Sequence, residues 1–156
     1  PLGSPEWVLY GSLQESLEAR LELRVCKREL WSIDHMDSFY SSLGNVAQIH
    51  PLEDEADRSA ALQRWRNIPD YVDQDISNLR QGVVSGYLVH IGVVERVITQ
   101  ITGLISMPLE TSPLTLMSRR VDNAAFASEL EDIVATSPNI GSILSRLISS
   151  TRAWTS

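Results

Sequence analysis

Cysteine is almost absent from this chain of 156 residues, and positive charge is scarce. The one cysteine, Cys26, excludes an internal disulfide bond and a cysteine-rich zinc or iron–sulfur site. Thirteen Lys and Arg stand against twenty Asp and Glu, so the formal net charge is -7. Because an acidic protein repels a phosphate backbone, this balance argues against nucleic acid as a partner.

The chain also lacks a long, uninterrupted apolar run. Its most apolar stretch, 83–107, carries His90, Glu95 and Arg96 where the centre of a bilayer would lie, so we predict no membrane-spanning helix. No signal-peptide pattern opens the sequence, which leaves a cytoplasmic and an exported location both open. Pro1-Leu2-Gly3-Ser4 is typical of the remnant of a cleaved fusion tag, and we expect residues 5–156 to form a single domain.

Apolar residues recur at helical spacing along most of the chain. Ser12-Leu13-Gln14-Glu15 has the form of a capping box, and Leu13, Leu17 and Leu21 follow at intervals of four. Cap residues, acidic first turns, prolines and glycines mark the other boundaries. We predict helices from Ser12 to about Trp31, from Asp37 or Ser38 to before Pro51, from Glu53 to Ile68, from Pro69 to Gly86, within 89–105, after Asp122 or Asn123, and after Ser137-Pro138.

The stretch 89–105 is the one place where a strand competes with a helix. It is rich in β-branched residues, which favour strands. However, Val94, Val97, Ile98, Ile101 and Ile105 keep one helical stripe, whereas strict alternation fails at Glu95-Arg96 and Thr99-Gln100. The expected fold is therefore all-α, an antiparallel bundle or array of about five to seven helices.

The histidines and the cysteine do not form a recognisable catalytic motif. His35, His50 and His90 are too far apart for the His-x-x-x-His spacing of a helical zinc site, and we interpret them as loop and surface residues unless the fold brings them together. Cys26 lies among Leu23 and Leu30, which favours a small core residue over a nucleophile. The spacing of Gly82, Gly86 and Gly92 does not match that of a phosphate-binding loop.

Two further patterns have a chemical and a structural reading. Asp70 and Asp73 are neighbours across one helical turn and could form an acid–base site with Asp75. We favour a structural interpretation, in which the helix dipole stabilises Asp70 and water solvates the other two carboxylates. The segment 64–66, Arg-Trp-Arg, resembles a stacking patch but has no basic surroundings, so Trp65 is expected in the core. We therefore assign no catalytic, cofactor-binding or metal-binding residue.

Several segments resemble a known family, in the same order and at similar spacing. The family is called domain of unknown function 885, and the resemblance covers about residues 12–150. The loop from His35 to His50 does not align with it. The segments are Arg28-Glu29-Leu30-Trp31, Trp65 to Tyr71, Ile76 to Val83, Gly86-Tyr87, Val93 to Ile98, Thr111 to Leu114, and Phe126.

The resemblance implies a larger, mostly helical parent of metallopeptidase-like or hydrolase-like character. Many members carry a His-Glu-x-x-His zinc motif toward the C-terminus, which no histidine of this chain matches, so any zinc would belong to the remaining part of the parent. We expect this chain to be a non-catalytic N-terminal fragment that contacts the rest of the parent. The alternative is an autonomous helical module that binds a partner protein, or a second copy of itself, through exposed apolar faces.

Overall fold

The computed structural model describes residues 3–136 and 140–152, and within these ranges the chain is all-helical, with no strand. The predicted all-α fold of five to seven helices is confirmed. Three short 3-10 helices, η1 (Leu23–Cys26), η2 (Arg28–Leu30) and η3 (Pro113–Arg119), accompany the α-helices. The α-helices are α1 (Pro5–Glu22), α2 (Phe39–Ile49), α3 (Glu55–Arg66), α4 (Ile68–Val84), α5 (Ile91–Ser106), α6 (Ala124–Ala135) and α7 (Ile140–Arg152).

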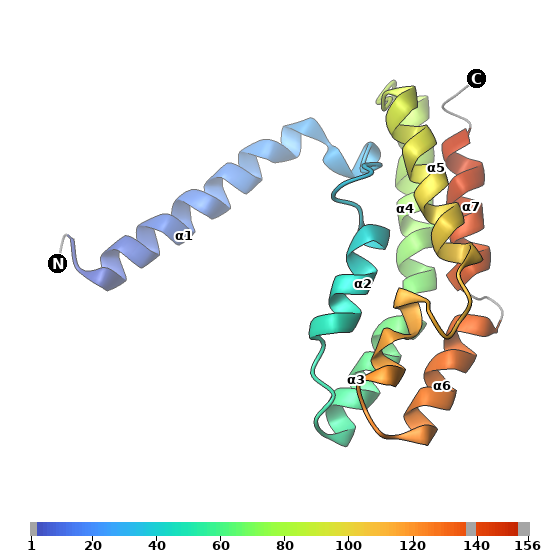
Figure 1. The fold of residues 1–156 in the computed structure, drawn as a ribbon. Coiled ribbons are helices and arrows are strands. Elements are labelled where there is room, and N and C mark those ends of the chain that lie inside the picture. The colour runs from blue at the N-terminus through green and yellow to red at the C-terminus, as the bar shows by residue number, and fades with distance from the viewer. Residues whose placement is uncertain (1–2, 137–139, 153–156) are drawn as a thin grey trace.

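The elements from α2 to α7 form a body, and α1 projects away from it (Figure 1). In the body, α7 packs against α4 and α5, while α3 packs against α6. The 3-10 helix η3 contacts both α2 and α6. Within the described residues, no helix is long and apolar enough to cross a membrane, as the charges in 83–107 predicted.

Trp65 is the largest side chain that is fully buried in the body. Its ring contacts the core, and its indole Nε1 donates a hydrogen bond of 2.9 Å to the carbonyl oxygen of Leu114. Because a buried indole N–H needs an acceptor, this bond fixes η3 against α3. The prediction that Trp65 is a core residue is confirmed.

Helix α4 shows why the sequence pattern predicts the body well. Its buried residues include Val72, Ile76 and Leu79, which follow the predicted apolar stripe. The helix ends at Val84, and Gly86, the residue after the Ser85 cap, has a φ of 80°. There the Tyr87 amide donates to the Gly82 carbonyl at 2.9 Å, and the Gly86 amide donates to that of Val83 at 3.1 Å. This pair of bonds is a Schellman motif, so the predicted glycine stop is confirmed.

Other predicted boundaries also hold. Asp54 caps α3, Asn123 caps α6, and Pro69 lies in the first turn of α4. The stretch 89–105 is helical from Ile91 onward, as its periodicity predicted, and forms most of α5. The predicted Ser137-Pro138 start of the last helix lies outside the described residues.

The boundaries predicted for the first helix were wrong. Helix α1 begins at Pro5, and the Ser4 side chain accepts a hydrogen bond from the Trp7 amide. Ser4-Pro5-Glu6 supplies a cap, a proline in the first turn and an acidic residue. This signal starts the helix at Pro5, well before the predicted start at Ser12. The α-helix ends at Glu22 and passes into η1, and Lys27, with a left-handed φ of 45°, then breaks the chain between η1 and η2, so no helix continues to Trp31.

Gly82 allows η2 to lie directly on α4. A Cβ atom built on Gly82 would lie 1.9 Å from the carbonyl oxygen of Leu30, far inside van der Waals contact. Leu30 is itself buried at this crossing. Only glycine therefore fits where the segment that follows α1 joins the body.

We expect Gly82→Ala to destabilise the body, since the backbone of η2 must move to admit a methyl group. The cost should be at least about 1–3 kcal/mol, as for other overpacked sites. Gly103→Ala is the matched control, because it also lies in a helix but has nothing within 4 Å of its added Cβ. The free energy of unfolding of that control should rise by about 0.5–1 kcal/mol, because alanine favours a helix more than glycine does. Urea denaturation of both variants would measure this, and equal stabilities would contradict the assignment.

Candidate functional site

The three histidines lie at separate places and serve the fold. His50 is buried, and its Nδ1 lies 2.8 Å from the carbonyl oxygen of Pro51. His90 caps α5, where its Nδ1 accepts from the Gly92 amide at 3.1 Å. Arg96 donates to Nε2 of His35 at 3.2 Å. Among the residues that the structure describes, no group of three His, Cys, Asp or Glu side chains could hold a metal ion.

Cys26 is exposed at the end of η1, so the prediction that it is a core residue was wrong. The predicted helical stripe of Leu23, Cys26 and Leu30 is broken, because left-handed Lys27 separates η1 from η2. Leu23 is exposed like Cys26, whereas Leu30, beyond this break, is buried.

The three aspartates of α4 separate into different environments. Asp73 pairs with Arg146 of α7 on the protein surface. Asp70 lies exposed in the first turn of the helix, as the dipole argument predicted. Asp75 instead lines a cavity, and its carboxylate accepts a hydrogen bond of 2.8 Å from Ser32 Oγ.

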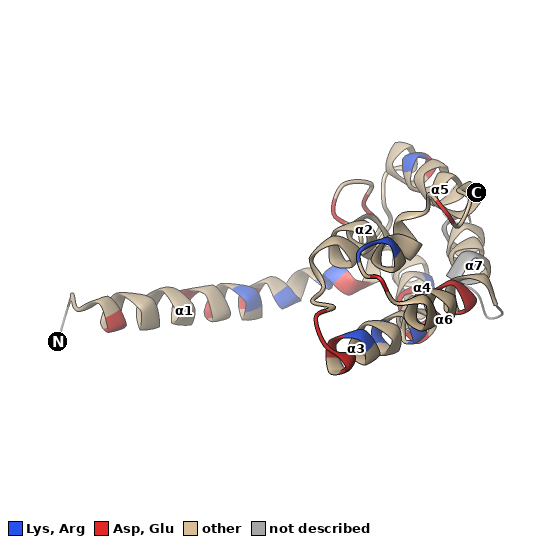
Figure 2. Cartoon of the chain, turned by 60° about the horizontal axis from the view of Figure 1, so that its bottom comes forward, with Lys and Arg blue, Asp and Glu red and all other residues tan. Residues whose placement is uncertain are grey.

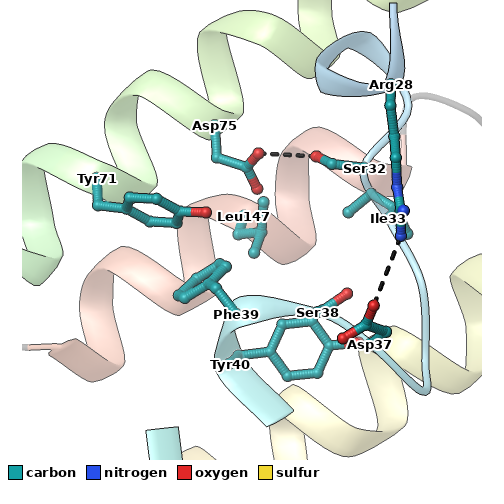
Figure 3. Close-up of a pocket in the computed structure, with 10 residues that line it drawn as sticks. All are labelled: Arg28, Ser32, Ile33, Asp37, Ser38, Phe39, Tyr40, Tyr71, Asp75 and Leu147. Atoms are coloured by element: carbon teal, nitrogen blue, oxygen red, sulfur yellow. Dashed lines mark hydrogen bonds and ion pairs between the residues drawn. The ribbon is translucent and has the colours of Figure 1, made fainter. Parts of the chain in front are cut away.

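The cavity beside Asp75 has a volume of about 100 Å³ and lies between α4, α2, α7 and the segment that follows η1 (Figure 3). Asp75 and Tyr71 reach it from the same face of α4, one turn apart. Phe39 lies opposite them, with its ring centroid 4.9 Å from that of Tyr71 in an edge-on arrangement. Arg28 and Asp37 border the cavity from the other side. We call these walls and the space they enclose the Asp75 cavity.

Burial shapes the electrostatics of this cavity. Burial raises the pKa of Asp75, and the hydrogen bond from Ser32 opposes that rise only in part. Burial, together with the negative charge of Asp75, also raises the pKa of Tyr71. Arg28 lies 3.7 Å from Asp37, but both side chains are largely exposed, so their attraction is weak. No Lys, Arg or His among the described residues pairs with Asp75.

A second feature is the surface of α1, which has no buried residue. Its large apolar side chains are each between 51% and 72% exposed. Acidic residues and one basic residue, Arg20, lie among these apolar side chains, so α1 carries charges of both signs (Figure 2). We define the α1 surface by Trp7, Val8, Leu9, Tyr10, Leu13, Leu17 and Leu21.

Residues 2–147 match a family described as "Bacterial protein of unknown function (DUF885)". The chain belongs to this family. The resemblance carried by the ordered sequence segments is thereby confirmed over almost the whole chain. No curated protein and no solved structure gave a significant match.

The DUF885-like segments meet in the body of this protein. Arg28 to Trp31 forms η2 and one rim of the Asp75 cavity. Trp65 to Tyr71 supplies the core tryptophan, the joint between α3 and α4, and one aromatic wall of the cavity. Ile76 to Val83 supplies the buried face of α4 and Gly82. The segments that carry the family resemblance therefore build the core and part of the cavity.

Sequence reasoning missed the Asp75 cavity. A signal was present in α4, because Tyr71 and Asp75 are four residues apart and share a helix face. The contribution of Ser32 could not be foreseen, because Ser32 lies 43 residues before Asp75 in the chain and local spacing does not show that the two meet.

The raised pKa of Asp75 predicts a pH-dependent stability. The folded chain binds this proton more tightly than the unfolded chain, so the stabilisation is fully present below the ordinary aspartate pKa and is lost as pH rises through the raised one. At neutral pH, burial of the charged carboxylate lowers the free energy of unfolding. We expect Asp75→Asn to stabilise the protein at neutral pH, with a gain that shrinks as pH falls toward about 4.

Urea denaturation at a series of pH values would measure this gain. Asp70→Asn is the matched control, since it removes a carboxylate from the exposed first turn of the same helix. The control should lose about 0.3–1 kcal/mol at neutral pH. A loss of stability at neutral pH in Asp75→Asn would contradict the assigned cost of burying this charge.

Proposed function

We propose that this chain is a non-catalytic helical region of a larger, metal-dependent hydrolase-like protein, and that α1 packs it against the rest of that protein. The observation that carries the proposal is the absence of any buried residue in α1, although the helix has seven large apolar side chains. Of these seven, Leu9, Leu13, Leu17 and Leu21 share one face of the helix, and an exposed apolar stripe of this kind is typical of a contact site.

The energetics of α1 support a partner surface. A helix of 18 residues spans about 27 Å, and isolated helices of this length are only marginally stable in water. Covering the apolar side chains would contribute about 25 cal/mol per Å² of apolar area. An α1 that lies against other protein is therefore much more stable than an α1 that projects into water.

The spacing of the α1 residues favours a helical partner. Leu9, Leu13, Leu17 and Leu21 recur every four residues, which is the spacing of ridges that fit the grooves of another helix. Charges of both signs lie around this stripe, with Glu18 and Glu22 close to Arg20. The occupant we propose is a helical surface of the remaining part of the same parent chain.

The hydrolase part of the proposal is supported by the family resemblance and by no geometry of this chain. The zinc motif that many members carry would lie in the remaining part of the parent. His35, His50 and His90 do not fit as zinc ligands here, because they serve different elements. We therefore give this chain a supporting role in the parent.

The alternative, an autonomous interaction module, is favoured by one observation. The body has a continuous core of its own, which draws residues from α2, α3, α4, α5, α6 and α7 and includes Trp65. A body with its own core can fold without further chain, and α1 would then be an arm for binding a separate protein.

The docking role of α1 can be tested in the longer parent protein with Leu13→Glu/Leu17→Glu. In the parent, we expect slow amide hydrogen exchange over residues 5–22. In this variant, the exchange should become fast, because two charges cannot enter an apolar contact. In the chain of 156 residues alone, the same variant should change stability by less than about 0.5 kcal/mol, since both side chains are exposed there.

Gly11→Glu/Ala19→Glu is the matched control, since it adds the same charge to the face of α1 opposite Leu13 and Leu17. Its exchange pattern should follow that of the unmodified parent. Exchange of α1 that is equally fast in the parent and in the short chain would overturn the docking role. Absence of bound zinc in the parent would overturn only the hydrolase part.

The short chain itself separates the two candidate functions. For a fragment, we expect light scattering to show self-association or a hydrophobic dye to bind, with both effects reduced by Leu13→Glu/Leu17→Glu. A cooperative thermal melt of a monomer that binds no dye would favour the autonomous module.

A further inference from the structure

We propose that the Asp75 cavity binds a primary alkylammonium group, such as a small amine or the side-chain amine of a lysine. The proposal is independent of how α1 docks. It rests on a half-buried carboxylate without a basic partner among the described residues, set beside aromatic rings and hydrogen-bond acceptors.

The carboxylate supplies the charge. Asp75 Oδ1 is held by Ser32 Oγ, so the carboxylate is fixed in orientation, and burial weakens its contact with water. A charge in such a setting gains from a cation more than an exposed one does, because a partly buried pair is screened less. Figure 3 shows the carboxylate directed into the space between Tyr71 and the segment of Ser32.

The aromatic rings complete a surface that suits a cation. Tyr71 and Phe39 meet edge-on, and Phe39 and Tyr40 have ring centroids 5.8 Å apart with an interplanar angle of 85°. The face of an aromatic ring attracts an ammonium group and also accepts the methylene carbons next to it. A carboxylate beside aromatic rings therefore fits an alkylammonium better than an anion.

The hydrogen bonds already formed argue for a donor ligand. Ser32 donates to Asp75, Tyr40 donates to the carbonyl oxygen of Asp34 at 2.8 Å, and Ser38 donates to the same oxygen. These three hydroxyls give their protons to protein acceptors, and Ser38 Oγ also accepts from the Asp34 amide at 3.1 Å, so Ser32 and Tyr40 keep lone pairs for a ligand. An ammonium group brings up to three N–H donors, which suit the Asp75 carboxylate and these lone pairs, while Arg28, the cation among the lining residues, is paired with Asp37.

Size sets the limit on the ligand. A cavity of about 100 Å³ corresponds to roughly three water molecules in the liquid, so it holds an ammonium with one or two carbons. The longer part of a ligand would leave past Arg28 and Asp37, whose side chains are exposed. Tyr71, on the opposite wall, is exposed as well.

Amide and aromatic NMR shifts of the full chain would test the site, with ethylammonium chloride and Nα-acetyl-lysine N-methylamide as probes. We expect saturable shifts near Ser32 and Tyr71 in the millimolar range. Potassium chloride at the same ionic strength and ethanol, which is neutral, should not reproduce them. Binding of only one probe would identify the source of the amine, and binding of neither would overturn the proposal.

Variants make the test specific. Asp75→Asn should weaken binding at least about tenfold, because an amide cannot compensate the cation, whereas Asp70→Asn should bind normally. Tyr71→Phe keeps the aromatic face and should bind, but Tyr71→Leu should not bind as tightly. Circular dichroism would establish that each variant is folded. Equal binding by Asp75→Asn and the unmodified chain would overturn the proposal.

Discussion

The contact between Gly82 and the backbone of Leu30 is the constraint on which the rest of this structure depends. Because α4 has no side chain at this point, η2 can lie against it and bury Leu30. The segment after η2 is then close enough for Ser32 to reach Asp75, and this contact closes the cavity. The segment before η2 turns at Lys27 and leads away from the body, so the same contact leaves α1 without a neighbour in Figure 1.

The sequence predicted the helices of the body because their apolar stripes and caps agree. In α4, the stripe of Val72, Ile76 and Leu79 and the glycine stop indicated the same helix, and the structure has it. The stripe of Leu13, Leu17 and Leu21 was equally clear, yet nothing in the described chain buries it. Periodicity shows which face of a helix is apolar, but it cannot show whether another element covers that face. The misplacement of Cys26 in the core has the same cause.

The candidate site was harder to predict than the fold, because it depends on contacts between distant segments. The residues of α4 could be compared on one helix, and the place of Asp70 in the exposed first turn was inferred correctly. The environment of Asp75 depends on Ser32 and Phe39, whose positions follow from the Gly82 crossing and from the irregular segment before α2. Local spacing carries no information about such a crossing, so the cavity could be found only from the three-dimensional arrangement.

The separation of α1 from the core has an evolutionary consequence. Substitutions in the core, such as those at Trp65, are constrained by the packing of neighbouring helices and by the bond to Leu114. The apolar positions of α1 face no such neighbour within the described chain, so selection on them comes from whatever surface they meet. The body and the arm of this DUF885 protein can therefore diverge at different rates, and a change of partner would require substitutions in α1 while the core stays as it is.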